Sequence, residues 1–513
     1  MTLSAGKRYF AMRLFRFIFS RIFICLVFIA ALFAAIIFLC LYIHSLLPAA
    51  WALVVAGIFS LIIAVVIMSR PSPSAFRCAW LALVAALPFF GALVYLLAIS
   101  KPARKPLPQG RAMVCGDSDA EYLADGADYL KRLKERIDGA KEYVYLEYYI
   151  IARGRVWTEI FSALRAALGR GVEVKIIYDG VGSALRAPVR SLRTLEREGA
   201  ATAVFRKPSP LPFYRLNCRD HRKIAVIDGQ YAFTGGVNIA DEYANLTSPH
   251  GHWKDGGAML TGKIASAFAE LFTENFLRAD KKRGAARRNC RRKNADADGR
   301  RQKRGKTAGA EGAPPDCPAD GCGHNMQGSI PSFFPTPADG CAALIYDNPF
   351  GGIYEDVSAS LIYSATERVY ILTPYLCMDD KLSDALKFAA ARGADVRIVI
   401  PHIPDKRLTF EITRTYADSL ISHGVKIYEY TPGFLHTKSV ICDDCAAVGS
   451  YNFDFRSMRL NYECAAIARG RFAEKAAEDF LKTSAMSAPR VPVKHGAVRR
   501  SARRIIALFA PLV

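Results

Sequence analysis

The residues best suited to chemistry in this chain are two histidine–lysine pairs with the same spacing. The pattern H-x-K-x-x-x-x-D occurs in two copies, made of His221, Lys223 and Asp228 and of His436, Lys438 and Asp443. Alternate residues of a β-strand share a face, so each histidine points the same way as its lysine. A histidine can attack or donate a proton, and a lysine ammonium can hold an anionic oxygen.

A small residue and an asparagine follow each copy. Gly235-Gly236-Val237-Asn238 follows the first copy, and Gly449-Ser450-Tyr451-Asn452 follows the second. Small residues let the backbone approach a ligand, and the Asn238 and Asn452 amides can donate to phosphate oxygens. A phosphodiester suits this set better than a carbonyl, because its charge is spread over several oxygens. One copy would be weak evidence, but the duplication favours a functional site.

With these motifs the chain resembles the bacterial cardiolipin synthases of the phospholipase D superfamily, whose members carry two HKD motifs. The resemblance spans about residues 51–280 and 341–513 and includes the runs that flank both motifs. These runs are NCRD at 217–220, GHWKD at 251–255, TPY at 373–375, PHIPDK at 401–406, YEYTPGF at 428–434, NFDFRS at 452–457 and NYE at 461–463.

The resemblance implies a transfer between two phosphatidylglycerol molecules that gives cardiolipin and glycerol through a phosphohistidine. It implies that His221 attacks phosphorus and that His436 acts as general acid and then general base. Lys223, Lys438, Asn238 and Asn452 would hold the phosphate oxygens. Neither motif requires a metal, so no metal or other cofactor is expected; Cys317, Cys322 and His324 are too irregularly spaced to favour zinc.

Four carboxylates are candidates to support this site. Glu147, at the position in the first half that Thr373 has in the second, orients a histidine or is a strand-end carboxylate. Glu463 is the expected histidine partner in the second half. Asp228 and Asp443 belong to the motifs and are grouped with the catalytic residues, with a structural role in a turn as the alternative.

Strands that alternate with helices predict an α/β fold made of two similar phospholipase D-like halves. The fragments Arg-Gly-Val-Glu-Val-Lys-Ile at 170–176 and Arg-Gly-Ala-Asp-Val-Arg-Ile at 392–398 are an internal repeat. We expect a first half at 112–280 and a second half at 341–513, with largely parallel sheets. A pseudo-two-fold arrangement would bring His221 and His436 together. The segment 121–141 is expected to be an amphipathic helix.

The first 111 residues predict a membrane block that precedes the two halves. The segments 22–43, 47–69 and 78–100 contain no charged residue, and each has the length of a transmembrane helix, about 20 residues. We therefore expect a multi-pass protein of the bacterial plasma membrane, with a kink at Pro88. Basic residues flank both ends of the block, so the membrane side of the catalytic part stays open.

The formal net charge of +22 indicates a polyanionic partner. Fourteen of the basic residues lie between Arg278 and Lys306, and all of them except Arg278 fall in a low-complexity linker predicted at 281–340. No aromatic residues interleave there for base stacking, so we expect phosphatidylglycerol and anionic lipids as partners, and no nucleic acid. The C-terminal run at 499–509 joins basic and apolar residues and predicts a short interfacial helix. The oligomeric state stays open.

Two other functions fit part of the sequence. A phospholipase D that hydrolyses phospholipids to phosphatidic acid would use the same residues with water as the acceptor. A membrane protein that binds anionic lipid without catalysis would use the basic linker, but it would not need two intact motifs.

Overall fold

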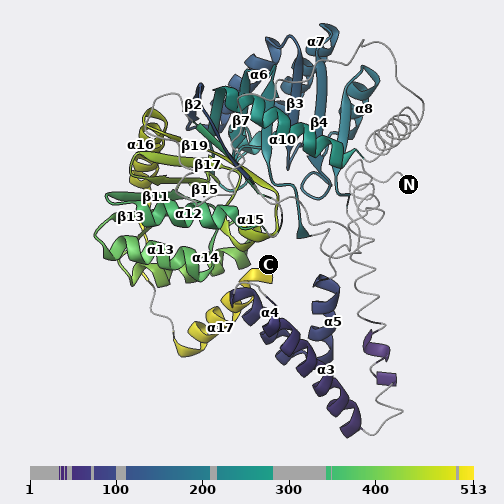
Figure 1. The fold of residues 1–513 in the computed structure, drawn as a ribbon, viewed down its shortest axis with the longest axis vertical. Helices are drawn as coiled ribbons and strands as arrows, with labels where there is room; N and C mark the ends of the chain where they lie inside the picture. Colours follow the sequence, from purple (N-terminus) through teal and green to yellow (C-terminus); the bar gives the residue numbers. More distant parts are fainter. Residues whose placement is uncertain are drawn as a thin grey trace, which may run out of the picture.

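The computed structural model describes residues 49–70, 74–99, 111–207, 217–280, 342–347, 351–492 and 496–512, with isolated positions at 34–42 and 349. The predicted linker at 281–340 lies outside the described residues, as does most of the first apolar segment, 22–43. Figure 1 shows two α/β halves, one blue to teal and one green, and a purple group of helices that projects from them.

The first half is built on a seven-stranded mixed sheet. In spatial order its strands are β2 (Ser118–Leu123), β9 (Gly257–Gly262), β7 (Tyr231–Gly235), β6 (Lys223–Ile227), β3 (Tyr143–Tyr148), β4 (Glu173–Asp179) and β5 (Ala201–Phe205). Only the pairs β3–β4 and β4–β5 are parallel, and the other four are antiparallel. The expectation of largely parallel sheets was therefore wrong, because consecutive strands such as β6 and β7 form hairpins.

The second half repeats this sheet strand for strand and adds one strand at each edge. Its order is β1 (Arg111–Cys115), β10 (Ala342–Asp347), β19 (Glu463–Arg469), β17 (Cys445–Gly449), β16 (Ser439–Cys442), β11 (Arg368–Leu372), β13 (Asp395–Pro401), β14 (Lys426–Tyr430) and β20 (Ser487–Pro489). The central seven strands pair with the same directions as in the first half. The prediction of two similar halves is confirmed.

The strand β1 crosses between the halves. It immediately precedes β2 of the first half, yet it pairs antiparallel with β10 at the edge of the second sheet, Arg111 opposite Tyr346. The predicted boundary at residue 112 therefore cuts through a strand of the second sheet.

Helices cover both faces of each sheet. The outer face of the first sheet carries α6 (Gly126–Asp138), α7 (Arg155–Gly169) and α8 (Val189–Arg197), and that of the second carries α12 (Ile353–Ser364), α13 (Asp380–Ala391) and α14 (Arg407–Ile421). Between the sheets lie α10 (Lys263–Ala279) and α16 (Arg471–Ala485), whose Phe268, Phe272 and Phe480 join side chains of both sheets in one core. The result is five layers, with the shared core in the middle (Figure 1).

Local sequence explains where these elements begin. The α6 helix starts after Asp125, whose carboxylate accepts hydrogen bonds from the N–H groups of Ala127 and Asp128. Tyr129, Leu133 and Ile137 are buried at helical spacing. The expected helix over 121–141 is shorter, because residues up to Leu123 extend the sheet as β2.

Asp228 and Asp443 close the turns after the two motif strands. The Asp228 carboxylate accepts hydrogen bonds of 2.8–2.9 Å from the N–H groups of Lys141, Glu142 and Tyr143, which lead into β3. The Asp443 carboxylate accepts bonds of 2.8–3.0 Å from residues 366–368, which lead into β11. Both aspartates have positive φ, 53° and 50°, a conformation that Asp tolerates in turns.

This geometry corrects the grouping of Asp228 and Asp443 with the catalytic residues. The strand β6 separates His221 from Asp228, and five strand residues span about 16 Å. The two aspartates therefore lie at the opposite ends of the motif strands from the histidines, where they hold the start of the neighbouring strand.

The N-terminal helices α3 (Ala49–Ser69), α4 (Ser74–Ala86) and α5 (Pro88–Ile99) pack on one another through Ile63, Val84 and Tyr95. None of the described helices has the length and apolar character of a membrane crossing. The expected spans at 47–69 and 78–100 are thus not found, and the second of these segments is two short helices that break before Pro88.

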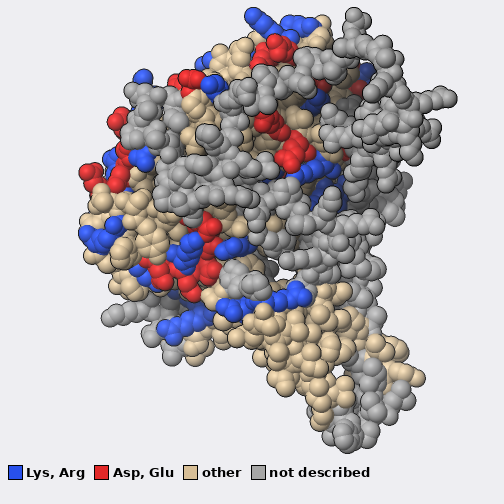
Figure 2. All heavy atoms as spheres, in the orientation of Figure 1, with Lys and Arg blue, Asp and Glu red and all other residues tan. Residues whose placement is uncertain are grey.

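The C-terminal helix α17 (Ala497–Leu508) and the 3-10 turn η3 (Ala510–Leu512) join these helices to the second half. Arg503 pairs with Asp418 of α14 at 3.0 Å, and Ala510 packs in a cluster with Phe76 of α4 and Phe455 of α15 (Phe455–Arg459). Figure 2 shows blue basic side chains where the largely uncharged projecting part meets the catalytic halves.

We predict that Asp443→Ala lowers the free energy of unfolding by about 2 kcal/mol, because three backbone N–H groups lose their acceptor. Asp444→Ala is the matched control, since the exposed Asp444 forms only a surface pair with Arg469, which contributes less than about 1 kcal/mol. Urea unfolding of both variants measures the difference. Equal stability of the two variants would contradict the role assigned to Asp443.

Candidate active site

The two motif histidines meet where the halves join. The backbone N–H of His221 donates to the carbonyl of Tyr462 in the second half, at 2.9 Å. The backbone N–H of His436 donates to the carbonyl of Lys254 in the first half, at 2.7 Å. Each histidine is therefore fixed by the backbone of the opposite half.

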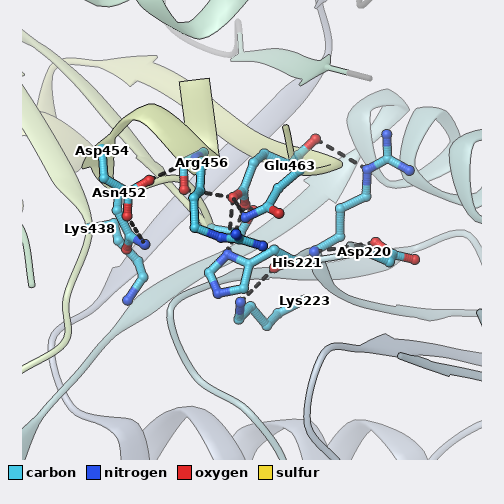
Figure 3. Close-up of polar contacts among 12 residues, drawn as sticks. Asp220, His221, Lys223, Lys438, Asn452, Asp454, Arg456 and Glu463 are labelled. Atoms are coloured by element: carbon cyan, nitrogen blue, oxygen red, sulfur yellow. Dashed lines mark hydrogen bonds and ion pairs between the residues drawn. The ribbon is translucent and has the colours of Figure 1, made fainter. Parts of the chain in front are cut away.

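The side chains cross between the halves in the same way. His221 Nδ1 lies 3.0 Å from Oε1 of Glu463, and His436 Nδ1 lies 2.6 Å from Oδ2 of Asp255. In both cases the carboxylate directly follows the residue whose carbonyl holds the histidine backbone. Because each carboxylate occupies Nδ1, the Nε2 atom of each ring is left for chemistry. Figure 3 shows His221 beneath Glu463.

Short cross-half strands fix this arrangement. The strand β8 (His252–Lys254) pairs in parallel with β15 (Gly433–Leu435), which leads directly to His436. Lys254 donates to Asp479 of α16 at 2.7 Å, and Asp479 also accepts from Tyr122 of β2 at 2.7 Å. This buried network ties the Lys254 carbonyl, and with it His436, to both halves.

Glu463 is surrounded by donors. Its oxygens accept hydrogen bonds from Ser450 Oγ at 2.5 Å and Ser457 Oγ at 2.8 Å. Burial alone would raise the pKa of this carboxyl, but His221, Lys223 and Ser450 lower it below its ordinary value. Glu463 is therefore ionised and selects the tautomer of His221 with its proton on Nδ1, so that Nε2 carries a lone pair.

Asp255 has a different environment. One oxygen accepts from the N–H of Gly256 at 2.8 Å, and burial raises the pKa of this carboxyl to about 7, against the opposing charge of Lys438. Gly236 makes room for it, because a Cβ there would lie 2.1 Å from Oδ1. Ser450 directly follows β17, just as Gly236 directly follows β7. At this equivalent position the first half leaves space for the Asp255 carboxylate, whereas the second half supplies a hydroxyl that donates to Glu463.

The two pairs consequently differ by one proton below about pH 7. Burial lowers the pKa of the His436 imidazole well below its ordinary value, so the additional proton resides on Asp255. A protonated Asp255 donates to Nδ1 of His436 and leaves a proton on Nε2. Such a difference would suit His221 to attack as a nucleophile and His436 to donate a proton.

The two motif lysines are buried beside the histidines. Lys223 Nζ donates to the carbonyl of His221 at 2.5 Å, and Lys438 donates to the carbonyl of His436. Burial lowers the pKa of Lys223 to about 8 and that of Lys438 to about 7. An anionic group bound between these ammonium groups would stabilise their charge, so the site favours a phosphate.

Aromatic rings form the walls of the site. Tyr149 meets the His221 ring edge to face, with 4.9 Å between centroids. Tyr243, Trp253 and Phe434 surround the His436 ring at 5.3–5.9 Å. These rings limit water around both histidines.

The two predicted phosphate-binding asparagines are not alike. Asn238 donates one amide N–H to the Tyr243 hydroxyl at 2.6 Å, and its amide oxygen accepts from the Ile150 N–H at 3.0 Å. The Asn238 amide is therefore partly used in hydrogen bonds within the protein. Asn452 Nδ2 donates to Asp454 at 3.1 Å, while its buried Oδ1 has no partner among the described residues. Figure 3 places Asn452 beside Lys438.

Of the two carboxylates predicted to support the histidines, Glu463 contacts a histidine, and that histidine is His221 of the first half. Glu147 lies instead in a buried polar cluster, where its carboxylate accepts from Asn275 Nδ2 at 2.9 Å and lies 3.9 Å from the guanidinium of Arg222. Of the two alternatives for Glu147, the geometry favours a structural carboxylate.

Sequence reasoning did not assign a role to Asp255. Its position in the fold corresponds to that of Glu463, since Asp255 shortly precedes β9 and Glu463 begins β19. The signal is an acidic residue at the end of an aromatic-containing triplet, Trp253-Lys254-Asp255 in one half and Asn461-Tyr462-Glu463 in the other.

The described part of the chain contains no group of three or more metal-ligating side chains. Cys317, Cys322 and His324 lie outside the described residues.

Comparisons with known proteins agree with this geometry. The family described as "Cardiolipin synthase, PLD-like domain" matches residues 133–249 and 359–483. A cardiolipin synthase of Listeria welshimeri is 30% identical over 400 residues, which cover 76% of this chain and 72% of that protein. This chain belongs to the cardiolipin synthase family of the phospholipase D superfamily. It is a phospholipase D-type enzyme, and the predicted family is confirmed.

Other proteins are also similar to this chain. A cardiolipin synthase of Alkalihalophilus pseudofirmus is 31% identical over 69% of this chain, and the match spans only 63% of that relative's length. An uncharacterised protein of Streptococcus mutans is 35% identical over 67% of each chain. The solved phosphatidylserine synthase of Haemophilus influenzae shares the fold, with a TM-score of 0.54 and 13% identity over 76% of this chain and 95% of that one.

We predict that Glu463→Gln lowers kcat by a factor of about 10² to 10⁴, because the neutral amide cannot stabilise the positive charge that develops on His221. Glu474→Gln, on the exposed face of α16, is the control and leaves kcat unchanged. Steady-state turnover measures both. A loss of less than threefold in Glu463→Gln would contradict the role of the carboxylate.

A second prediction concerns pH. Lys223 and Lys438 carry charge below their pKa values of about 8 and about 7, and Asp255 keeps its proton below about 7. All three groups lose a proton as the pH rises through 7–8. We therefore expect kcat/KM to fall with pH more steeply than it would if a single group lost its proton.

The pH–rate profile of Lys438→Arg is the check, because an arginine stays charged over this range. We expect a shallower alkaline limb in this variant, whatever its absolute rate. An unchanged slope, or a single-proton limb in the unmodified enzyme, would contradict the assignment.

Proposed function

We propose that this chain makes cardiolipin and glycerol from two phosphatidylglycerol molecules. The observation that carries the proposal is the pair of crossed histidine–carboxylate contacts beside two buried lysines. Two rings with different proton occupancy beside one anion-binding site suit a double displacement at phosphorus.

In the first step Nε2 of His221 attacks the phosphorus of one phosphatidylglycerol. The bond from phosphorus to the headgroup glycerol breaks, and His436 Nε2 gives its proton to the departing oxygen while the Asp255 proton moves to Nδ1. Glycerol leaves, and the phosphatidyl group stays on His221. Glu463 stabilises the positive charge of this phosphohistidine.

In the second step the primary hydroxyl of another phosphatidylglycerol gives its proton to the His436–Asp255 pair, and its oxygen attacks phosphorus. The nitrogen–phosphorus bond breaks and cardiolipin leaves. One phosphodiester is exchanged for another, so no further energy source is needed. Lys223, Lys438 and the Asn452 amide hold the phosphate oxygens in both steps, and Asn238 contributes through its remaining N–H.

We also propose that α3–α5 and α17 attach the enzyme to a bacterial plasma membrane. Val55, Leu61 and Val65 of α3 are at least 60% exposed, although large apolar side chains are usually buried. Arg504 of α17 is exposed, and its positive charge suits anionic headgroups. Such attachment would bring the enzyme to its lipid substrates.

The test is turnover of phosphatidylglycerol by the purified full chain in mixed micelles with a chelator, followed by mass spectrometry. We expect equal amounts of cardiolipin and glycerol, and rates at least about 10³-fold lower for His221→Ala and His436→Ala. His423→Ala is the control, because His423 is exposed at the end of α14. Phosphatidic acid without cardiolipin would mean a hydrolase, and lipid binding without turnover would exclude an enzyme.

The covalent step has its own test. Rapid denaturation at alkaline pH preserves a phosphohistidine, and peptide mass spectrometry then locates the phosphatidyl group. We expect it on His221 and not in His221→Ala. A phosphatidyl group on His436 would reverse the two histidine roles.

A further inference from the structure

The proposed reaction places a requirement on the His436 side of the site. His436 protonates the departing glycerol and later takes a proton from the incoming hydroxyl, so both headgroups occupy the same side. The incoming phosphatidylglycerol also carries its own phosphate, three carbons from the reacting hydroxyl. Water and free glycerol lack this second phosphate, so a cation that binds it would select the lipid acceptor.

Lys406 lies on this side of the site. It directly precedes α14 and is exposed, and its Nζ atom lies 5.4 Å from the centroid of the Tyr375 ring. The Tyr375 hydroxyl donates to the carboxylate of Asp405. The Tyr375 ring packs against the cluster that contains Tyr243, Trp253 and Phe434, the three rings around His436.

The segment that carries Lys406 is fixed on the strands that lead to His436. The N–H of His402 donates to the carbonyl of Tyr430 at 3.3 Å. Ile403 Cδ1 lies 3.4 Å from the position of a Cβ on Gly251, directly before β8. Besides burial, which has the largest effect, the charge of Lys406 is among those that lower the pKa of the His436 imidazole.

The charge of Lys406 is available to a ligand. Among the described residues it forms no ion pair or hydrogen bond through its side chain. In the first half, the loop after β4 corresponds to the loop after β13 that bears Lys406, and it carries Arg186. Nη1 and Nη2 of Arg186 each donate to the carboxylate of Glu242, at 2.6 and 2.7 Å, so this guanidinium is ion-paired within the protein. The two halves thus differ in the loop that borders the headgroup site.

We propose that Lys406 binds the phosphate of the acceptor phosphatidylglycerol and thereby directs the phosphatidyl group to a lipid alcohol. The first turn of α14, which begins next to Lys406, contains no acidic residue, so its N-terminal partial charge adds to that of the ammonium. This inference rests on the proposed function and assigns a determinant of acceptor specificity.

The experiment compares two acceptors for the same phosphatidyl-enzyme. The full-length enzyme is incubated with phosphatidylglycerol micelles and isotope-labelled glycerol. Labelled phosphatidylglycerol reports transfer to a neutral acceptor, and cardiolipin reports transfer to a phosphate-bearing one. We expect Lys406→Ala to lower the ratio of cardiolipin to labelled phosphatidylglycerol about tenfold or more, because a charged hydrogen bond to the acceptor is lost.

Arg407→Ala removes one positive charge at the next exposed position and should leave the ratio unchanged. Lys406→Arg keeps the charge and should restore most of the ratio. A ratio unchanged in Lys406→Ala, or lowered equally in Arg407→Ala, would overturn the inference alone. An unmodified enzyme that exchanges glycerol but forms no cardiolipin would overturn the proposed function and the inference with it.

Discussion

The site depends on a reciprocal contact in which each half holds the catalytic histidine of the other. Glu463 and the Tyr462 carbonyl hold His221, while Asp255 and the Lys254 carbonyl hold His436. A shift of one half against the other would break both contacts together. The structure resists such a shift with the β8–β15 pair, the buried Lys254–Asp479 bridge and the continuous core around α10 and α16. Much of the fold can be understood as support for the relative position of two imidazole rings.

Although the halves repeat each other strand for strand, the chemistry requires them to differ. His221, Lys223 and Ser450 lower the pKa of the Glu463 carboxyl, whereas burial raises to about 7 the pKa of Asp255, which occupies the space left by Gly236. The loops after β13 and β4 extend the difference: Lys406 has no ion pair among the described residues, whereas Arg186 is paired with Glu242.

The sequence predicted the two halves and the motif strands, because the H-x-K spacing and the alternation of strands and helices are local patterns. It did not predict the mixed sheets, since strand direction depends on which strands become neighbours. Asp255 was missed because the triplet that it shares with Glu463 is a weak signal in the sequence, and the equivalent positions of the two residues become clear only in the fold. Asp228 and Asp443 were misplaced for the opposite reason: they share the motif with the histidines, but a full strand length separates them in space. The predicted helix began at residue 121, whereas residues 121–123 belong to β2, because pairing with β9 overrides their local preference.

The strand β1 has a consequence for biosynthesis. It is made before any other part of the first half, yet its partner β10 follows the entire first half and the linker. During translation, β1 must therefore wait without a partner while the first sheet folds, and the pairing of Arg111 with Tyr346 closes a very long loop. Glu463 is made later still. His221 is thus synthesised long before the carboxylate that contacts its Nδ1, and this contact can form only after most of the second half has been made.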